Sequence, residues 1–180
     1  MIGIDLRFFD GKYLGGVYNI CISMIKSFNS QNDYLTIPVR SNKIRELLIK
    51  SGISNQNNII VKPLRLPYLI ETFLFGYLLF HKSIEIRIWP YYCSPLFLKG
   101  NKKNILGLWD ITPVTNPSSY NFSHRLIVPL LMRISAYRCK KVLACSHYDC
   151  NQINTSLTTK YPAVYFPLPI NKEKTKINYK

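Results

Sequence analysis

MIGIDLRFFDGKYLGGVYNICISMIKSF, residues 1–28, opens the chain and decides its fold. The apolar run Ile2–Leu6 predicts a short strand, and a loop carrying Gly15 and Gly16 follows it. Val17–Phe28 repeats apolar residues at 3.6-residue spacing, which predicts an amphipathic helix. This order is typical of nucleotide-binding α/β domains, because glycine lets backbone N–H groups approach a phosphate at a helix N-terminus. The loop matches neither the dinucleotide fingerprint nor a Walker A loop, so an ordinary strand-to-helix turn is an equal alternative.

Apolar runs and amphipathic segments alternate through the rest of the chain. Further strands are predicted at Tyr34–Val39, Ile59–Val61, Ile84–Trp89, Asn104–Trp109, Lys141–Cys145 and Ala163–Phe166. Further helices are predicted at Asn42–Ser51, at Tyr68–Phe80, from Asn121 or Ser123 to about Tyr137 with a kink or break at Pro129, and from Ser146 to about Leu157. The alternation predicts one α/β domain over residues 1–170, a Rossmann-like unit with a mostly parallel sheet and helices on both faces. A basic tail follows at 171–180.

Ligands of such sheets bind at the carboxyl ends of the strands. Four loops are therefore expected to converge there: Asp10–Gly16, Tyr91–Phe97, Asp110–Ser119 and Ser146–Asp149. The sequence thus places the candidate site at one edge of the sheet.

Four side chains in or near these loops are candidates for chemistry. Asp110 follows an apolar strand with Thr112 two residues on, so it either orients a sugar hydroxyl or accepts N–H groups of its own loop in an Asx turn. Ser146 is placed to cap a helix and also to meet a phosphate. Arg7, just past the first strand, either faces an anion in the same cleft or is solvated.

The net charge of the chain indicates which kind of binding partner to expect. The formal net charge is +15, from 24 Lys and Arg against 9 Asp and Glu. This excess indicates an acidic partner, unless it reflects a compositional bias toward lysine. The basic residues are scattered and no recognised motif is present, so nucleic acid is not expected.

The apolar run Tyr68–Phe80 is too short to span a bilayer. It predicts either a mostly buried helix or an interfacial helix on an anionic membrane.

Cysteine and histidine usage predicts neither a disulfide framework nor a metal site. The five cysteines are scattered without C-x-x-C spacing, and none of the three histidines has a carboxylate or cysteine at metal spacing. His81, His124 and His147 are expected at the surface or at helix caps. The N-terminus lacks the features of a signal peptide, so the expected location is the cytoplasm.

Taken in order, these motifs resemble the N-terminal domain of retaining GT-B glycosyltransferases of the family-4 type. The matching elements are Arg7-Phe8 with Gly15-Gly16, the loop Trp109-Asp110-Ile111-Thr112-Pro113, the basic stretch His124–Tyr137, and Val142–Ser146 with Asp149. The resemblance runs from Met1 to about Pro169, and it implies half of a GT-B fold.

The resemblance implies hexose transfer from a nucleotide-diphosphate sugar to a glycan or lipid-linked acceptor in surface polysaccharide synthesis. It places Gly15 and Gly16 near the donor diphosphate, gives Asp110 a catalytic role, and makes Arg7, Trp109, Thr112 and Ser146 substrate-binding candidates. It implies no metal or other cofactor, because protein cations and helix N-termini neutralise the leaving diphosphate. A location on the inner face of the plasma membrane fits the resemblance.

Two departures from the family qualify this expectation. Trp109 stands where the family has a histidine that contacts the donor sugar. The family's second domain carries a Glu-x7-Glu element, and no two glutamates of this sequence have that spacing. The sequence therefore predicts an acceptor-side half that needs a donor-binding domain, with a non-catalytic membrane- or partner-binding module on the same fold as the alternative.

Overall fold

The computed structural model describes residues 1–11, 16–30, 34–53, 58–97 and 103–167. The predicted basic tail and Gly15 lie outside these residues. One sheet has the strand order β3-β2-β1-β4-β5-β6-β7, and every neighbouring pair is parallel. Its strands are β1 (Ile2–Ile4), β2 (Leu35–Val39), β3 (Asn58–Val61), β4 (Ile86–Trp89), β5 (Lys103–Gly107), β6 (Lys141–Ala144) and β7 (Val164–Tyr165). The predicted α/β, Rossmann-like domain is confirmed.

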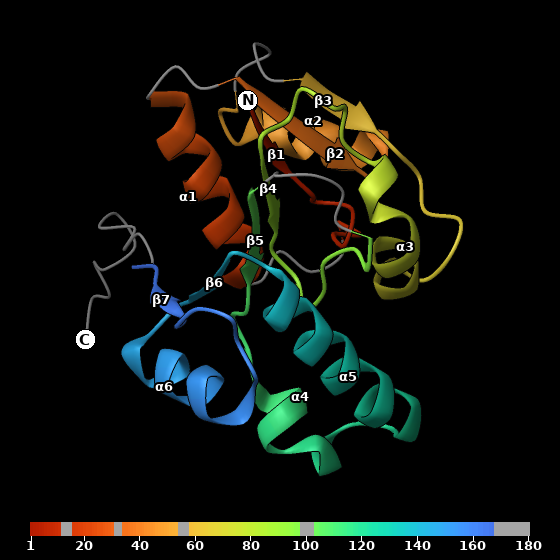
Figure 1. The fold of residues 1–180 in the computed structure, drawn as a ribbon. Helices are drawn as coiled ribbons and strands as arrows, with labels where there is room; N and C mark the ends of the chain where they lie inside the picture. The colour runs from red at the N-terminus through yellow and green to blue at the C-terminus, as the bar shows by residue number, and fades with distance from the viewer. Residues whose placement is uncertain (12–15, 31–33, 54–57, 98–102, 168–180) are drawn as a thin grey trace, which may run out of the picture.

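Helices cover both faces of the sheet (Figure 1). On one face, α1 (Gly16–Ser30) and α2 (Asn42–Lys50) enclose a core with side chains of β1 and β2. On the other face lie α3 (Tyr68–Phe75), α5 (Phe122–Arg138) and α6 (His147–Ser156), over a second core with Trp89 and Leu106. The remaining short helices are α4 (Thr112–Thr115) and the 3-10 helices η1 (Gly76–Leu78) and η2 (Pro117–Ser119).

The strand order reverses between β1 and β4, which are neighbours in the sheet. The chain from β1 leads into α1 on one face, whereas the chain from β4 leads toward the face of α5. The loops therefore diverge above this pair of strands, which is where open α/β sheets bind their ligands.

Several predicted boundaries were wrong. The helix predicted over Tyr68–Phe80 ends at Phe75 and continues only as the 3-10 turn η1. The backbone leaves the helical conformation at Phe75, with φ of −120° and ψ of −3°, and the carbonyl of Phe73 accepts the N–H of Leu96 at 2.7 Å. Gly76 follows, and a Cβ at this position would lie 2.8 Å from Pro95 Cγ. This segment is also not a mostly buried helix, because of its α3 residues only Thr72 is buried.

The loop predicted over Asp110–Ser119 contains α4 and η2, and the strand before it ends at Gly107 rather than at Trp109. Helix α5 begins after Asn121, whose side chain accepts the N–H of His124 at 3.0 Å. It continues through Pro129 to Arg138, so no break occurs there. Among the described residues, no helix combines the length and apolar character needed to cross a membrane.

Candidate functional site

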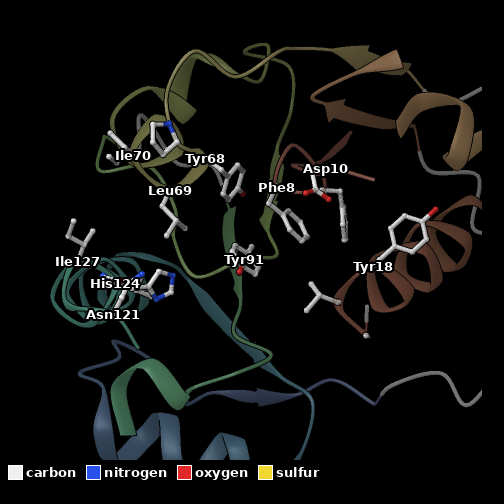
Figure 2. Close-up of a pocket in the computed structure, with 15 residues that line it drawn as sticks. Phe8, Asp10, Tyr18, Tyr68, Leu69, Ile70, Tyr91, Asn121, His124 and Ile127 are labelled. Atoms are coloured by element: carbon white, nitrogen blue, oxygen red, sulfur yellow. Dashed lines mark hydrogen bonds between the residues drawn. The ribbon is translucent and has the colours of Figure 1, made fainter. Parts of the chain in front are cut away.

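A hollow of about 690 Å³ opens where the strand order reverses (Figure 2). Phe8 reaches it from the chain after β1, Tyr91 from the chain after β4, and Tyr68 from the start of α3. The rings of Phe8 and Tyr91 stack at 4.8 Å between centroids with 7° between their planes. Tyr68 packs beside both, with its centroid 5.7 Å from Phe8 and 6.1 Å from Tyr91. The hollow therefore has an aromatic lining of ligand size.

Few polar side chains line this hollow, and no lysine or arginine of the described chain does. Asp10, Asn121 and His124 supply its polar groups (Figure 2). The imidazole of His124 stacks on Tyr120 at 5.1 Å, and its buried Nδ1 has no hydrogen-bond partner among the described residues. Gly16, the first residue of α1, is exposed at the same hollow. The lining therefore suits a ligand with an apolar face.

Asp110 sits beside this hollow and is held by three donors. Its Oδ1 accepts the N–H of Thr112 at 2.8 Å, so the predicted Asx turn is formed. Its Oδ2 accepts the hydroxyl of Tyr92 at 2.9 Å and that of Tyr120 at 3.4 Å. Burial alone would raise the pKa of Asp110, but hydrogen bonds from Thr112, Tyr92 and Tyr120 hold the pKa below its ordinary value. The carboxylate is therefore ionised and fixed in direction.

Tyr92 adopts a left-handed backbone conformation, with φ of 54°. No other non-glycine residue among those described has a positive φ. This conformation costs roughly 1–2 kcal/mol for a residue with a Cβ. The strained residue is also the one whose hydroxyl reaches Asp110, and such strain is found most often at functional sites.

The Tyr92→Phe substitution is expected to raise the pKa of Asp110, because the carboxylate loses one donor to its charged form. Since the folded pKa of Asp110 lies below the ordinary 3.8, its ionised form contributes stability that is present above that pH. This contribution is lost as the pH falls through the folded pKa, and the substitution moves that loss to higher pH. A ¹³C NMR titration of the Asp110 carboxyl carbon measures the change.

The matched control is Tyr18→Phe on α1. It removes a hydroxyl that forms a hydrogen bond with Ser51 Oγ at 3.1 Å. It is expected to leave the titration of Asp110 unchanged. An unaltered Asp110 pKa in Tyr92→Phe would contradict the role assigned to this hydrogen bond.

Trp109 lies over the strand that precedes it. A Cβ on Gly107 would stand 2.5 Å from Trp109 Cζ2, so the indole occupies the space that a side chain at 107 would need. The indole N–H is buried and has no acceptor among the described residues. Trp109, Asp110, Thr112 and Asp149 line a smaller hollow of about 280 Å³.

Ser146 caps α6, as its position in the sequence predicts. Its Oγ accepts the N–H of Asp149 at 3.0 Å and donates to Asp149 Oδ2 at 2.6 Å. Asp149 Oδ2 also accepts a hydrogen bond from the thiol of Cys145 at 3.0 Å. Burial and the neighbouring Asp149 raise the pKa of Cys145 to about 11, so this thiol stays protonated. Ser146 and Asp149 therefore both find hydrogen-bond partners within this loop.

Arg7 is neither solvated nor grouped with Asp110 and Ser146. It is 4 % exposed and lies against α3. Its Nε donates to Asp5 Oδ1 at 3.0 Å, and its Nη1 donates to Glu71 Oε1 at 2.6 Å. The expectation of a solvated arginine is therefore wrong, and the guanidinium joins the end of β1 to α3.

The four predicted loops meet in pairs. The chain after β1 and the chain after β4 share the aromatic hollow, whereas Asp110 and Asp149 share the smaller one. The hydrogen bond from the Tyr92 hydroxyl to Asp110 links the loops of one hollow to those of the other. Sequence reasoning expected this convergence but did not select Phe8, Tyr68 or His124 as lining residues. A signal was present, because aromatic residues stand within four positions of the end of both strands that flank the reversal.

The fold and this site define a class: a Rossmann-like α/β domain with a ligand-sized aromatic hollow at the reversal of strand order. Comparisons with models of known protein families, with curated proteins and with solved structures gave no match. Among the described residues, no cluster of histidine, cysteine or acidic side chains has the arrangement of a metal site.

Proposed function

We propose that this chain is the acceptor-side domain of a glycosyltransferase that moves a hexose from a nucleotide-diphosphate sugar to a glycan or lipid-linked acceptor. The observation that carries the proposal is the aromatic hollow at the reversal of strand order. The C–H faces of a sugar ring pack well on aromatic rings, and Phe8, Tyr68 and Tyr91 present such rings there.

Asp110 supports the same proposal. It lies at the carboxyl end of β5, is ionised, and is oriented by three hydrogen bonds. A carboxylate fixed in this way is suited to orient an acceptor hydroxyl or to stabilise positive charge that develops on the sugar ring. Gly16 at the N-terminus of α1 lies at the same hollow and keeps the role of a donor-diphosphate contact in this proposal.

In this proposal the nucleotide-diphosphate sugar is bound by a second domain that carries a Glu-x7-Glu element. Activity is therefore measured after this domain is supplied, as release of the nucleoside diphosphate in the presence of acceptor. Release that needs both halves supports the proposal. If no nucleoside diphosphate is released with any donor-binding domain encoded nearby, the result would count against the proposal.

The Tyr91→Ala substitution is expected to weaken sugar binding to the isolated chain about tenfold, because a stacked ring of the lining is lost. Saturation-transfer NMR with methyl glycosides and short oligosaccharides measures this binding. Tyr91→Phe keeps the ring and is expected to bind as the unaltered chain does. Tyr34→Ala removes an exposed tyrosine ahead of β2 and serves as the control. Equal binding by Tyr91→Ala and the control would remove the hollow as the sugar site.

A second candidate function is a membrane-binding module without catalysis. It is favoured by large apolar side chains that are exposed on α3 and α5: Ile70, Leu74, Phe75, Phe122, Leu126, Ile127 and Leu130. Ile70 and Ile127 lie at the mouth of the aromatic hollow (Figure 2). Salt-sensitive binding to anionic vesicles together with no sugar binding would favour this candidate over the first.

A further inference from the structure

A second hollow, of about 580 Å³, lies between α3 with η1 and the chain that joins β3 to α3. This connecting chain swings out beyond α3 before it enters the helix (Figure 1). None of the residues that line this hollow also lines the aromatic hollow, so the two are separate. Its volume falls in the range of small-molecule sites.

Glu71 fixes the floor of this second hollow. Its Oε1 accepts from Arg7 Nη1, and its Oε2 accepts the backbone N–H groups of Arg65 at 2.6 Å and Leu66 at 3.1 Å. The carboxylate therefore holds the connecting chain in place. Both of its oxygens are engaged by donors, and it shares the guanidinium of Arg7 with Asp5.

The rim carries two cations without a carboxylate partner. Lys62 and Arg65 are exposed and line the hollow. The ion pairs among the described residues join Arg7 to Asp5 and to Glu71, and neither rim cation takes part in them. The open side of the hollow is thus positively charged.

The walls are apolar and incompletely covered. Leu66 is 42 % exposed, Phe75 48 % and Leu78 67 %, although all three line a concave surface. An apolar wall next to unpaired cations matches one ligand chemistry, in which an alkyl chain is joined to an anionic head.

We propose that this hollow binds a single-chain amphiphile with an anionic head. The head lies at Lys62 and Arg65, and the alkyl chain packs against Phe75 and Leu78. This site is independent of the proposed glycosyltransferase activity, because it uses other residues on another side of α3. Loss of one function therefore leaves the other testable.

The test uses dodecyl phosphate below its micellar concentration, titrated into the full chain by isothermal calorimetry at low salt. Saturable binding of one molecule per chain is expected. The double variant Lys62→Glu/Arg65→Glu is expected to bind at least about tenfold more weakly, because the head then meets two like charges. Leu78→Gln, at an exposed position that tolerates a polar residue, is expected to weaken binding through the alkyl chain.

The control variant is Lys43→Glu/Arg45→Glu on α2, on the opposite face of the sheet. It makes the same change of charge and of residue types at exposed positions, and it is expected to bind as the unaltered chain does. Equal weakening in both double variants would show a general charge effect and overturn the site.

Two further arms identify the source of the head group. Displacement of dodecyl phosphate by millimolar inorganic phosphate would show a phosphate site without an alkyl subsite, and would overturn the amphiphile. Binding to vesicles of anionic phospholipid without binding of the monomer would assign the surface to a bilayer instead of to one molecule. The proposal is supported if monomeric dodecyl phosphate binds saturably, inorganic phosphate does not displace it, and binding is not confined to vesicles.

Discussion

The Arg7→Met substitution is expected to lower the free energy of unfolding by about 3–5 kcal/mol, because it leaves the buried carboxyl of Asp5 without its cation, and this carboxyl must then stay charged without a partner or take up a proton. Asp5 is 0 % exposed, and Arg7 supplies both the Nε bond at 3.0 Å and the Nη2 bond at 3.1 Å to its carboxylate. The same guanidinium reaches Glu71 and the hydroxyl of Thr72 on α3. Its removal thus also weakens the attachment of α3 to the end of β1, where the hydroxyl of Tyr68 still donates to Asp5 Oδ2 at 3.4 Å.

Urea unfolding at pH 7, followed by circular dichroism, measures the loss. Arg45→Met on α2 removes an exposed arginine and is the control, with an expected change within about 0.5 kcal/mol. Adding Asp5→Asn to Arg7→Met is expected to recover part of the stability, since a buried amide costs less than an unpaired carboxylate. A loss below about 1 kcal/mol in Arg7→Met would contradict the assigned role.

The Trp89→Ala substitution is expected to cost about 3–5 kcal/mol through the cavity that it leaves. Trp89 is 0 % exposed and ends β4. Its ring packs edge-on against Phe80 at 5.4 Å between centroids, and its indole N–H donates to Asn104 Oδ1 on β5 at 3.1 Å. Because Tyr91 lies two residues further along the chain, the same loss is expected to loosen one wall of the aromatic hollow.

Trp89→Phe separates the ring from the hydrogen bond, and an intermediate loss is expected because most of the packing is kept. The sequence has two tryptophans, so Trp109 remains as the fluorescent reporter of unfolding in either variant. Equal stability of Trp89→Ala and the unaltered chain would falsify the assignment of this side chain to the core.

Much of the fold follows from the local pattern of the sequence. Apolar runs and the spacing of Val17–Phe28 identify strands and helices correctly, because each element buries one face or both against its neighbours. Boundaries failed where a tertiary contact decides them. The helix starting at Tyr68 ends early where the carbonyl of Phe73 accepts the N–H of Leu96, which lies in a distant part of the sequence.

The candidate site was less predictable, for two physical reasons. Besides the neighbouring Asp5, Arg7 binds Glu71, and sequence alone gives no measure of which distant carboxylate a buried cation meets. Tyr92 adopts a left-handed backbone conformation although it is not a glycine. The sequence therefore gives no indication of the turn that brings its hydroxyl to Asp110. By contrast, the cap at Ser146 is a local contact, and local spacing was enough to find it.

The central position of β1 has a consequence for the order in which a newly made chain folds. Ile2 pairs with Leu35 on one side and with Ile86 on the other. We expect β1, β2 and β3 to form with α1 and α2 before β4 is synthesised, so that β1 presents an open edge until β4 pairs with it. The roughly 25 residues between β3 and β4 take about one to five seconds to translate. During that interval we expect the nascent chain to carry an unpaired strand edge that other chains can join, so aggregation is expected to begin most readily at this stage of synthesis.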